Sequence, residues 1–307
     1  MDDLDRLSGK RERLSQRDLI QRAARSFFHD RGFLEVSTPL LSFSVIPEEH
    51  IDLLESEAGF LLPSPEVHMK PLLASGFERI FQIGPRYRRG ERGAQHLPEF
   101  TLLEWYRAHA DYQSLATDSE ELVLFLHRSQ SGGSSLTYQG TRIDLLRPWP
   151  RLTVRTAFRM HAGWDPWEDR DPERFEWDFA EKVIPGLDPQ RPVFLVDFPA
   201  YEASLARRKP GDPETAERIE LFIGGLELAN GFSELVDPQE QRMRFERANE
   251  KRRSLGRTGY PLPQKFLESL RRMPPSAGIA LGFDRMVMLL TDSACIDEVV
   301  AFAPEDL

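Results

Sequence analysis

The amino-acid sequence predicts an α+β fold in which an antiparallel β-sheet is flanked by helices. Two long β-like stretches, 79–109 and 218–235, each contain a turn signal that is typical of a hairpin. Predicted strands also outnumber the helices that would connect parallel strands as crossovers. These observations favour an antiparallel sheet over a doubly wound parallel one.

The N-terminal part is expected to contain two helices separated by short strands. Apolar residues recur at helical spacing from Ser15 to Arg31. The strands are expected at 33–36 and 59–62. In the second helix, Ser64 is the expected N-cap and Pro65 the first helical residue, and Pro71 should kink or restart the helix.

The stretch 79–109 is predicted to be a hairpin with a long tip, 88–98, that is rich in Arg and Gly. Asp111 is placed to cap a helix that runs to about Arg128. The segment 129–135 that follows is rich in Ser and Gly, and it indicates a surface loop or a domain boundary with about equal weight.

The C-terminal half carries the strongest β signal. Residues 218–223 and 226–235 are expected to pair around the turn dipeptide Gly224-Gly225. The other expected elements are a buried strand at 193–198, helices at 238–254 and 263–273, and a strand at 278–281 leading through Gly282 into a helix at 283–292.

Composition and charge narrow the class of protein. The 307 residues are 40% hydrophobic and 29% charged, which is enough apolar material for the core of one large domain or two small ones. The formal net charge of −10 makes extensive nucleic-acid binding unfavourable. Cys295 is the single cysteine, which excludes an internal disulfide, and no stretch resembles a signal peptide or a membrane span. A cytoplasmic location without membrane attachment is expected.

Charged residues inside otherwise apolar β patterns mark candidate sites, although the sequence has neither a P-loop, a GxGxxG motif nor zinc-type spacing. The basic tip with His96 suits a nucleotide phosphate, or it is a solvated loop. Arg285 after Gly282 suits an anion at a helix start, or it is an exposed side chain beside a cap. The stretch Glu104-Trp105-Tyr106, on the strand after the tip, is interpreted either as ligand contacts or as part of the core.

The second hairpin carries four further polar residues: Glu220, Glu227, Asn230 and Glu234. By the period of a strand, Glu220 and Glu227 can reach the same face, where oxygen ligands suit Mg²⁺ that bridges phosphates. Glu234 suits an ammonium group, because a buried carboxylate needs a paired charge. The alternative is a set of surface carboxylates on an edge strand.

In their order along the chain these residues resemble the three motifs of class II aminoacyl-tRNA synthetases. The helix and strand that end at Pro39 match motif 1, 88–100 matches motif 2, and 282–285 matches motif 3. The resemblance spans nearly the whole chain and implies the class II catalytic domain. Four segments are similar to the lysine-specific branch: Ser64–Glu66, His96–Thr101, Leu103–Tyr106 and Glu227–Leu235.

The resemblance also implies a domain organisation. Lysyl-tRNA synthetases carry an anticodon-binding OB domain ahead of the catalytic domain, whereas motif 1 here ends at Pro39. We therefore expect residues 1–307 to form one catalytic domain without an OB domain. This is similar to the stand-alone paralogues that ligate lysine or (R)-β-lysine to a lysine of translation elongation factor P. Ala280 replaces a Gly that is usual in the tRNA-charging enzymes, and the acidic net charge also favours a protein acceptor.

The family implies the role of each site residue, with ATP and Mg²⁺ as cofactors. Catalysis is expected to involve Arg88, which would bind the α-phosphate and the substrate carboxylate, Arg285, which would bind the γ-phosphate, and Glu227. Expected ATP contacts are Arg88, Glu91, His96, Phe100 stacked on adenine, Glu227, Leu228, Gly282 and Arg285. Expected amino-acid contacts are Ser64, Pro65, Glu66, Glu104, Tyr106, Asn230, Glu234 and Ala280. Expected Mg²⁺ ligands are Glu220 and Glu227.

One position departs from the family pattern. Motif 2 commonly reads Arg-x-Glu, whereas here the third residue is Gly90, followed by Glu91. Either the loop shifts so that Glu91 contacts ATP, or that contact is absent. Because motif 1 normally builds a two-fold interface, a homodimer with 16–41 at the interface is expected. The alternatives to elongation factor P ligation are a truncated lysyl-tRNA synthetase, which charges tRNA or a tRNA-like acceptor, and a non-catalytic binding or regulatory paralogue.

Overall fold

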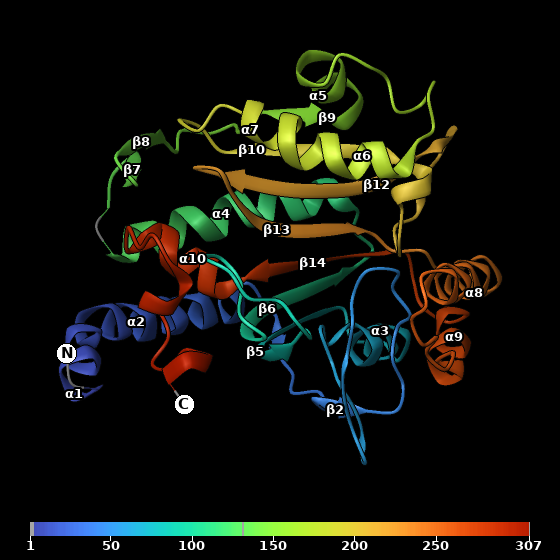
Figure 1. The fold of residues 1–307 in the computed structure, drawn as a ribbon, viewed down its shortest axis with the longest axis horizontal. Coiled ribbons are helices and arrows are strands. Elements are labelled where there is room, and N and C mark those ends of the chain that lie inside the picture. The colour runs from blue at the N-terminus through green and yellow to red at the C-terminus, as the bar shows by residue number, and fades with distance from the viewer. Residues whose placement is uncertain (1–2, 131, 307) are drawn as a thin grey trace.

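Both predicted hairpins lie at the centre of a nine-stranded mixed sheet in the computed structural model, which describes residues 3–130 and 132–306 (Figure 1). The strands are β1 (Leu34–Glu35), β2 (Leu41–Ser42), β3 (Leu54–Ser56), β4 (Gly59–Leu61), β5 (Arg79–Tyr87), β6 (Glu99–Ala108), β7 (Ser135–Tyr138), β8 (Thr141–Asp144), β9 (Arg151–Thr153), β10 (Val193–Pro199), β11 (Arg208–Lys209), β12 (Asp212–Ile223), β13 (Leu226–Ser233) and β14 (Ser276–Gly282). The helices are α1 (Asp3–Gly9), α2 (Arg11–His29), α3 (Glu66–Ala74), α4 (Tyr112–Gln130), α5 (Val154–His161), α6 (Pro172–Asp178), α7 (Ile184–Gly186), α8 (Pro238–Ser254), α9 (Gln264–Leu270) and α10 (Phe283–Leu290).

The main sheet has the order β1-β5-β6-β14-β13-β12-β10-β9, and β11 pairs with β12. All neighbours from β5 to β10 are antiparallel, whereas the outermost pairs β1–β5 and β9–β10 are parallel. Short strands form two further sheets, β2-β4-β3 and β7-β8. The prediction of an α+β fold with an antiparallel central sheet is confirmed.

The turn between β12 and β13 has the geometry that its sequence predicts. Gly224 and Gly225 both adopt positive φ, 59° and 79°. A two-residue turn of this kind follows the twist of the paired strands, but it strains residues that carry a Cβ. The turn therefore sets which residues of the two strands face each other.

One face of the main sheet packs against α2, α4 and α10 in a shared apolar core. The ring of Phe28 in α2 stacks on Phe81 of β5 with 4.7 Å between centroids, and it lies 5.3 Å from Trp105 of β6. The carboxylate of Asp111 accepts hydrogen bonds from the N–H groups of Gln113 and Ser114, so the predicted cap of α4 is confirmed. The opposite face carries two smaller apolar clusters, one with α3, α8 and α9 and one with α5 and α6, and polar side chains lie alongside them.

Two details of the N-terminal helices differ from the sequence prediction. The first long helix, α2, begins at Arg11 and ends at His29, and α1 precedes it. Pro71 does not restart α3, which continues to Ala74. A proline removes one hydrogen bond from a helix, and here the packing of Val67 and Leu73 in a second apolar core outweighs that loss.

The region between α4 and β10 contains elements that the sequence analysis did not predict. Helices α5 and α6 are capped by Thr153 and Asp171, whose side chains accept hydrogen bonds from backbone N–H groups. The β7–β8 hairpin contributes Leu136 and Ile143 to the core that α2 and α4 share. The Ser- and Gly-rich segment 129–135 is shorter as a loop than predicted, because residues 129 and 130 end α4 and Ser135 begins β7; residue 131 lies outside the described residues. Within the described ranges no helix combines the length and apolar character needed to cross a membrane.

Candidate functional site

The strand register places five of the polar-face positions in one row across the sheet. Gln82 of β5 faces Glu104 of β6, which faces Ala280 of β14. Ala280 in turn faces Asn230 of β13, and Asn230 faces Glu220 of β12. Because side chains alternate along a strand, this row points away from the core under α2, α4 and α10. The register therefore brings four of the predicted site residues together from four strands.

A cluster of charged and hydroxyl groups lies at one end of this face. We call it the pocket-floor cluster and define it as Glu66, Lys70, Glu104, Tyr106 and Glu234. The ammonium of Lys70 pairs with Glu66 one turn earlier in α3 and lies 2.6 Å from Glu234 Oε2. Tyr106 donates a hydrogen bond of 2.5 Å to Glu104, which also accepts one of 2.9 Å from the Ser64 hydroxyl.

Burial changes the protonation of the pocket-floor cluster. It raises the pKa of Glu234 to about 8, an effect that Lys70 opposes and Glu66 reinforces. It also raises the pKa of Glu104 to about 7, with Glu66 adding to the rise. Burial disfavours the charged form of Lys70, but the two carboxylates outweigh that effect and its pKa is raised. The cluster thus contains three carboxyl groups, Glu66, Glu104 and Glu234, and one cation, Lys70.

Ser64 and Pro65 place Glu66 at the start of α3. The helix has Pro65 as its N-cap, one residue later than predicted. The Ser64 hydroxyl still accepts a hydrogen bond of 3.1 Å from the N–H of Glu66, as a capping side chain does. Ser64 therefore links the helix start to Glu104 on the sheet.

Gly278 and Ala280 of β14 lie between the carboxylates of β6 and β13. A Cβ atom at Gly278 would lie 2.2 Å from the ring of Tyr106 and 2.8 Å from Glu234 Oε1, so no larger residue fits there. Ala280 is half-buried and lies two residues further along the same face. Because Gly278 and Ala280 are small, side chains from the neighbouring strands form the floor of the site.

Glu220 lies at the other end of the row among polar partners. It accepts a hydrogen bond of 2.6 Å from Arg218 and one of 3.2 Å from Asn230. Burial raises the pKa of Glu220 to about 7, Arg218 lowers it, and the carboxylate of Glu227 raises it again. Glu227 faces Phe222, two residues beyond Glu220 on β12, so the register brings the two predicted Mg²⁺ ligands to neighbouring positions of the hairpin.

The donor set fits Mg²⁺ chemically, because hard cations with phosphate partners prefer carboxylate oxygens. Among the described residues no group of three or more His, Cys, Asp or Glu side chains could hold a metal ion by itself. Glu220 and Glu227 alone would not complete the coordination shell of Mg²⁺, so phosphate oxygens would supply further ligands.

The predicted motif 2 residues lie at the edge of this face. The guanidinium of Arg88 lies 5.2 Å from the centre of the Phe100 ring and 3.5 Å from the carboxylate of Glu91. Gly90 is exposed with φ of 79°, so its backbone conformation is one that Glu rarely adopts. Glu91 thus lies beside Arg88, whereas position 90 offers no side chain.

The predicted motif 3 arginine joins three elements. Arg285 donates a hydrogen bond of 2.8 Å to the carbonyl of Glu227, one of 3.2 Å to the carbonyl of Gln95, and one of 2.5 Å to His96. Burial and the charge of Arg285 lower the pKa of His96, which keeps the imidazole neutral and able to accept. Gly282 is the N-cap of α10. Leu228 packs in the apolar core, so its backbone alone is left for the predicted ATP contact.

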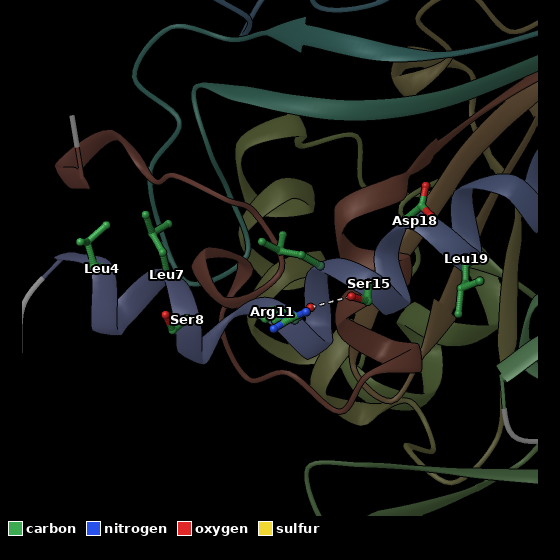
Figure 2. A pocket seen from close by; sticks show the side chains of 8 residues that line it. Leu4, Leu7, Ser8, Arg11, Ser15, Asp18 and Leu19 are labelled. Carbon is green, nitrogen blue, oxygen red and sulfur yellow. Dashed lines mark hydrogen bonds between the residues drawn. The ribbon is translucent and has the colours of Figure 1, made fainter.

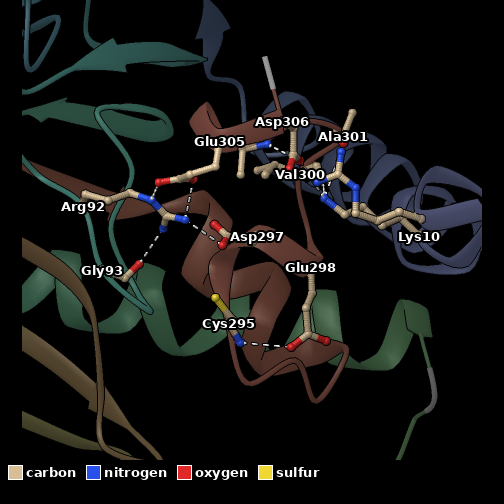
Figure 3. Close-up of polar contacts among 12 residues, drawn as sticks. Lys10, Arg92, Gly93, Cys295, Asp297, Glu298, Val300, Ala301, Glu305 and Asp306 are labelled. Atoms are coloured by element: carbon tan, nitrogen blue, oxygen red, sulfur yellow. Dashed lines mark hydrogen bonds and ion pairs between the residues drawn. The ribbon is translucent and has the colours of Figure 1, made fainter. Parts of the chain in front are cut away.

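The basic tip is less free than its sequence indicates. Arg92 makes ion pairs of 2.8 Å with both Asp297 and Glu305 of the C-terminal segment (Figure 3). The N–H of Ile296 also donates to the carbonyl of Ala94. We call Arg92, Asp297 and Glu305 the surface cluster. Arg92 belongs to the basic tip that was predicted to bind phosphate, but in the structure it pairs with two protein carboxylates.

Sequence reasoning missed two residues that the geometry places in the site. Lys70 follows Glu66 at the i+4 spacing that pairs charges on a helix, and this spacing was the available signal. Arg218 precedes Glu220 by two residues on β12, so period-2 alternation places both on one face. Neither residue forms a recognisable motif alone.

Comparison with known proteins agrees with this geometry. The family model for class II tRNA synthetases (D, K and N) matches residues 3–306. The chain is 37% identical to an elongation factor P (R)-β-lysine ligase of Vibrio vulnificus, over 95% of both chains. It is 39% identical to an elongation factor P (R)-β-lysine ligase of Edwardsiella ictaluri, over 94% of both.

A lysine–tRNA ligase of Pelotomaculum thermopropionicum is also 37% identical over 95% of this chain, which spans 63% of that relative's length. The relatives thus comprise proteins with two different acceptors. On these findings the chain belongs to the class II tRNA synthetase family.

Proposed function

We propose that this chain is an ATP-dependent ligase that activates lysine or (R)-β-lysine as an adenylate and transfers it to a lysine side chain of translation elongation factor P. The pocket-floor cluster is the observation that carries the proposal. Its side chains are buried, and its carboxylates exceed its ammonium groups. A diamino acid supplies the positive charge that such a site needs.

Within this proposal Glu66, Tyr106 and Glu234 read the amino groups of the substrate. Glu104 supports them through its hydrogen bonds to Tyr106 and Ser64. Pro65, Asn230 and Ala280 complete the predicted set: Pro65 caps α3, and the other two lie in the row across the sheet.

The nucleotide would lie along the other half of the face. Arg88 would neutralise the α-phosphate and the substrate carboxylate, and Arg285 the γ-phosphate, since guanidinium groups match phosphate oxygens. Adenine would stack on Phe100, with Glu91, His96, Leu228 and Gly282 nearby. Glu220 and Glu227 would hold Mg²⁺, which supplies charge neutralisation to the phosphates when bound.

The chemistry needs no covalent enzyme intermediate. The substrate carboxylate attacks the α-phosphorus of ATP, a P–O bond forms, and the bond to the leaving pyrophosphate breaks. The amine of the acceptor lysine then attacks the activated carbonyl, an amide forms, and AMP leaves. Catalysis consists mainly of positioning and electrostatic stabilisation, which agrees with a site rich in arginine.

The test is lysine-dependent pyrophosphate exchange, run with α-lysine and with (R)-β-lysine, followed by transfer to purified elongation factor P or to tRNA. Arg285→Ala should lower exchange by at least about 100-fold, because it removes a cation from the phosphates. Arg159→Ala is the control, since Arg159 is exposed on α5, outside the site and outside the segment 16–41, and should keep normal exchange. Near-normal exchange in Arg285→Ala would refute the role given to motif 3.

A truncated lysyl-tRNA synthetase is the second candidate, favoured by the similarity to lysine–tRNA ligases. The coverage supports the first candidate, since the chain spans 94–95% of the elongation factor P ligases and 63% of that lysine–tRNA ligase. Charging of tRNA without modification of elongation factor P would favour the truncated lysyl-tRNA synthetase over the elongation factor P ligase. Absence of exchange with any amino acid would favour a non-catalytic paralogue.

We also propose a single catalytic domain, a cytoplasmic location and a homodimer.

The proposed dimer is supported by an apolar groove that runs along α1 and α2, and Leu4, Leu7 and Leu19 line it (Figure 2). Leu4 and Leu19 are 70% and 54% exposed, which is unusual for leucines that face water in a group. The groove continues into the segment 16–41 that motif 1 places at the two-fold interface. A monomeric mass in light scattering would contradict the dimer.

A further inference from the structure

Lys70 has no role in the chemistry described above, yet it is among the most deeply buried charged residues of the site. Its side chain is 2% exposed, and its ammonium lies between the carboxylates of Glu66 in α3 and of Glu234 directly after β13. The rings of Phe232 and Phe266 lie 5.1 and 5.8 Å from the ammonium and exclude water from that side. A buried lysine of this kind is costly unless its partners need it.

The two oxygens of Glu234 have different surroundings. Oε2 is held by Lys70 at 2.6 Å. Oε1 is buried, has no hydrogen-bond partner within the part of the chain that the structure describes, and lies 2.8 Å from where a Cβ of Gly278 would be. Buried carboxylate oxygens normally have a partner. An unpaired oxygen of this kind, at the floor of an amino-acid pocket, points to a ligand that brings its own donor.

Resting on the proposed function, we infer that Lys70 is a positioning residue for substrate recognition. It binds one oxygen each of Glu66 and Glu234, and its charge favours the ionised form of Glu234, so that Glu234 Oε1 is available to an ammonium group of the diamino acid. Lys70 does not touch the substrate in this arrangement. It holds the two carboxylates in place and favours the ionised form of Glu234.

Several other charges face these two carboxylates. Glu104 and Tyr106 approach from β6, and Arg86, which is buried on β5, approaches Glu104. Glu48, in the segment before β3, lies near Glu66, Lys70, Arg88 and Arg218. Of the cations in this set, Lys70 is the one that pairs directly with Glu66 and Glu234.

The sign of the pH dependence follows from the raised pKa of Glu234, about 8 in the ligand-free protein. An ammonium binds the ionised carboxylate, so a protonated Glu234 must first lose its proton. The apparent affinity for lysine should therefore rise with pH up to about 8. Without the Lys70 charge the pKa of Glu234 moves higher, and the rise in affinity shifts to higher pH.

The experiment compares Lys70→Met with the wild type in pyrophosphate exchange between pH 6.5 and 9. Methionine has a similar length but no charge. We expect the KM for lysine to rise at least 10-fold at pH 7, with little change in kcat or in the KM for ATP. The pH midpoint of the lysine KM should shift upward by about one pH unit or more. Lys70→Arg keeps the charge and should keep the wild-type midpoint.

Lys209→Met is the matched control, because it also removes a paired lysine, 2.7 Å from Asp197, and it lies outside the pocket-floor cluster. If Lys70→Met does not fold, Lys70→Gln carries the same test. A lower kcat with the wild-type pH midpoint would mean that Lys70 only supports the structure, and it would overturn the inference. No lysine-dependent exchange in the wild type would instead refute the proposed function.

Discussion

The pocket-floor cluster and the surface cluster are both built from ion pairs between distant parts of the chain, but they differ in their exposure to water. The side chains of Lys70 and Glu234 are 2% and 0% exposed. Those of Arg92 and Glu305 are 33% and 61% exposed. The distances are almost the same, 2.6 and 2.8 Å, so geometry alone does not separate the two clusters.

The difference in exposure shifts the pKa values of the carboxyl groups in opposite directions. Burial raises the pKa of Glu234 to about 8 in spite of its cation. In the surface cluster the hydrogen bond from Arg92 lowers the pKa of Glu305. Water solvates an exposed carboxylate whether or not it is paired, whereas a buried one depends on its protein partners or on a ligand. We infer that the first cluster serves recognition and the second fastens the motif 2 tip to the C-terminal segment.

The largest expected effect is that of Glu234→Gln. The amide keeps the shape of the side chain but cannot carry the negative charge that the substrate ammonium needs. The KM for lysine should rise by about 100-fold or more, because truncating a buried charge pair costs roughly 2–5 kcal/mol. Steady-state pyrophosphate exchange over a range of lysine concentrations measures the change.

Glu217→Gln is the matched control for this variant. Glu217 is also buried and pairs with Arg207 at 2.5 Å, but it lies outside the pocket-floor cluster. The control should lower the melting temperature and leave the KM for lysine unchanged. Equal KM values in the two variants would show that the pocket-floor cluster is no more than a structural salt bridge.

An intermediate effect is expected in the pH dependence of stability. The pKa values of Glu104 and Glu234 are about 7 and 8 in the folded protein, against an ordinary 4.5. The folded state therefore holds protons that the unfolded state has lost, and these groups make the free energy of unfolding fall as pH rises from about 4.5 to 8.

Urea unfolding at pH 5.5 and pH 8 measures this slope. It should be smaller in Glu234→Gln, which has one titrating group fewer, and saturating lysine should raise stability more at pH 8 than at pH 5.5. A variant with the slope of the wild type would contradict the raised pKa of Glu234.

The smallest effect is expected for Arg92→Gln in the surface cluster. Exposed ion pairs contribute little to stability and are screened by salt. Melting temperature and the KM for lysine should stay close to wild type at 0.15 M salt, and any loss should grow at low ionic strength. A large loss of lysine binding in Arg92→Gln would erase the distinction between the two clusters.

Much of the fold could be predicted from local patterns. The Gly224-Gly225 turn, the cap at Asp111 and the alternation in 79–109 depend on residues close together in sequence, and the structure bears them out. The continuous helix across Pro71 could not be predicted, because its stability comes from packing against distant residues of α9. The small helices between α4 and β10 were missed although Thr153 and Asp171 give local cap signals there.

The sequence by itself determined the residue types of the candidate site and, through motif order, the family to which they belong. The tertiary structure decided which charges meet. It joined Lys70 to Glu234, 164 positions later, and brought Asn230 of β13 beside Glu220 of β12. It also engaged Arg92 with the C-terminal segment. The physical reason is that a carboxylate's charge state depends on burial and on its nearest partners, and both are set by how distant elements pack together and not by sequence spacing.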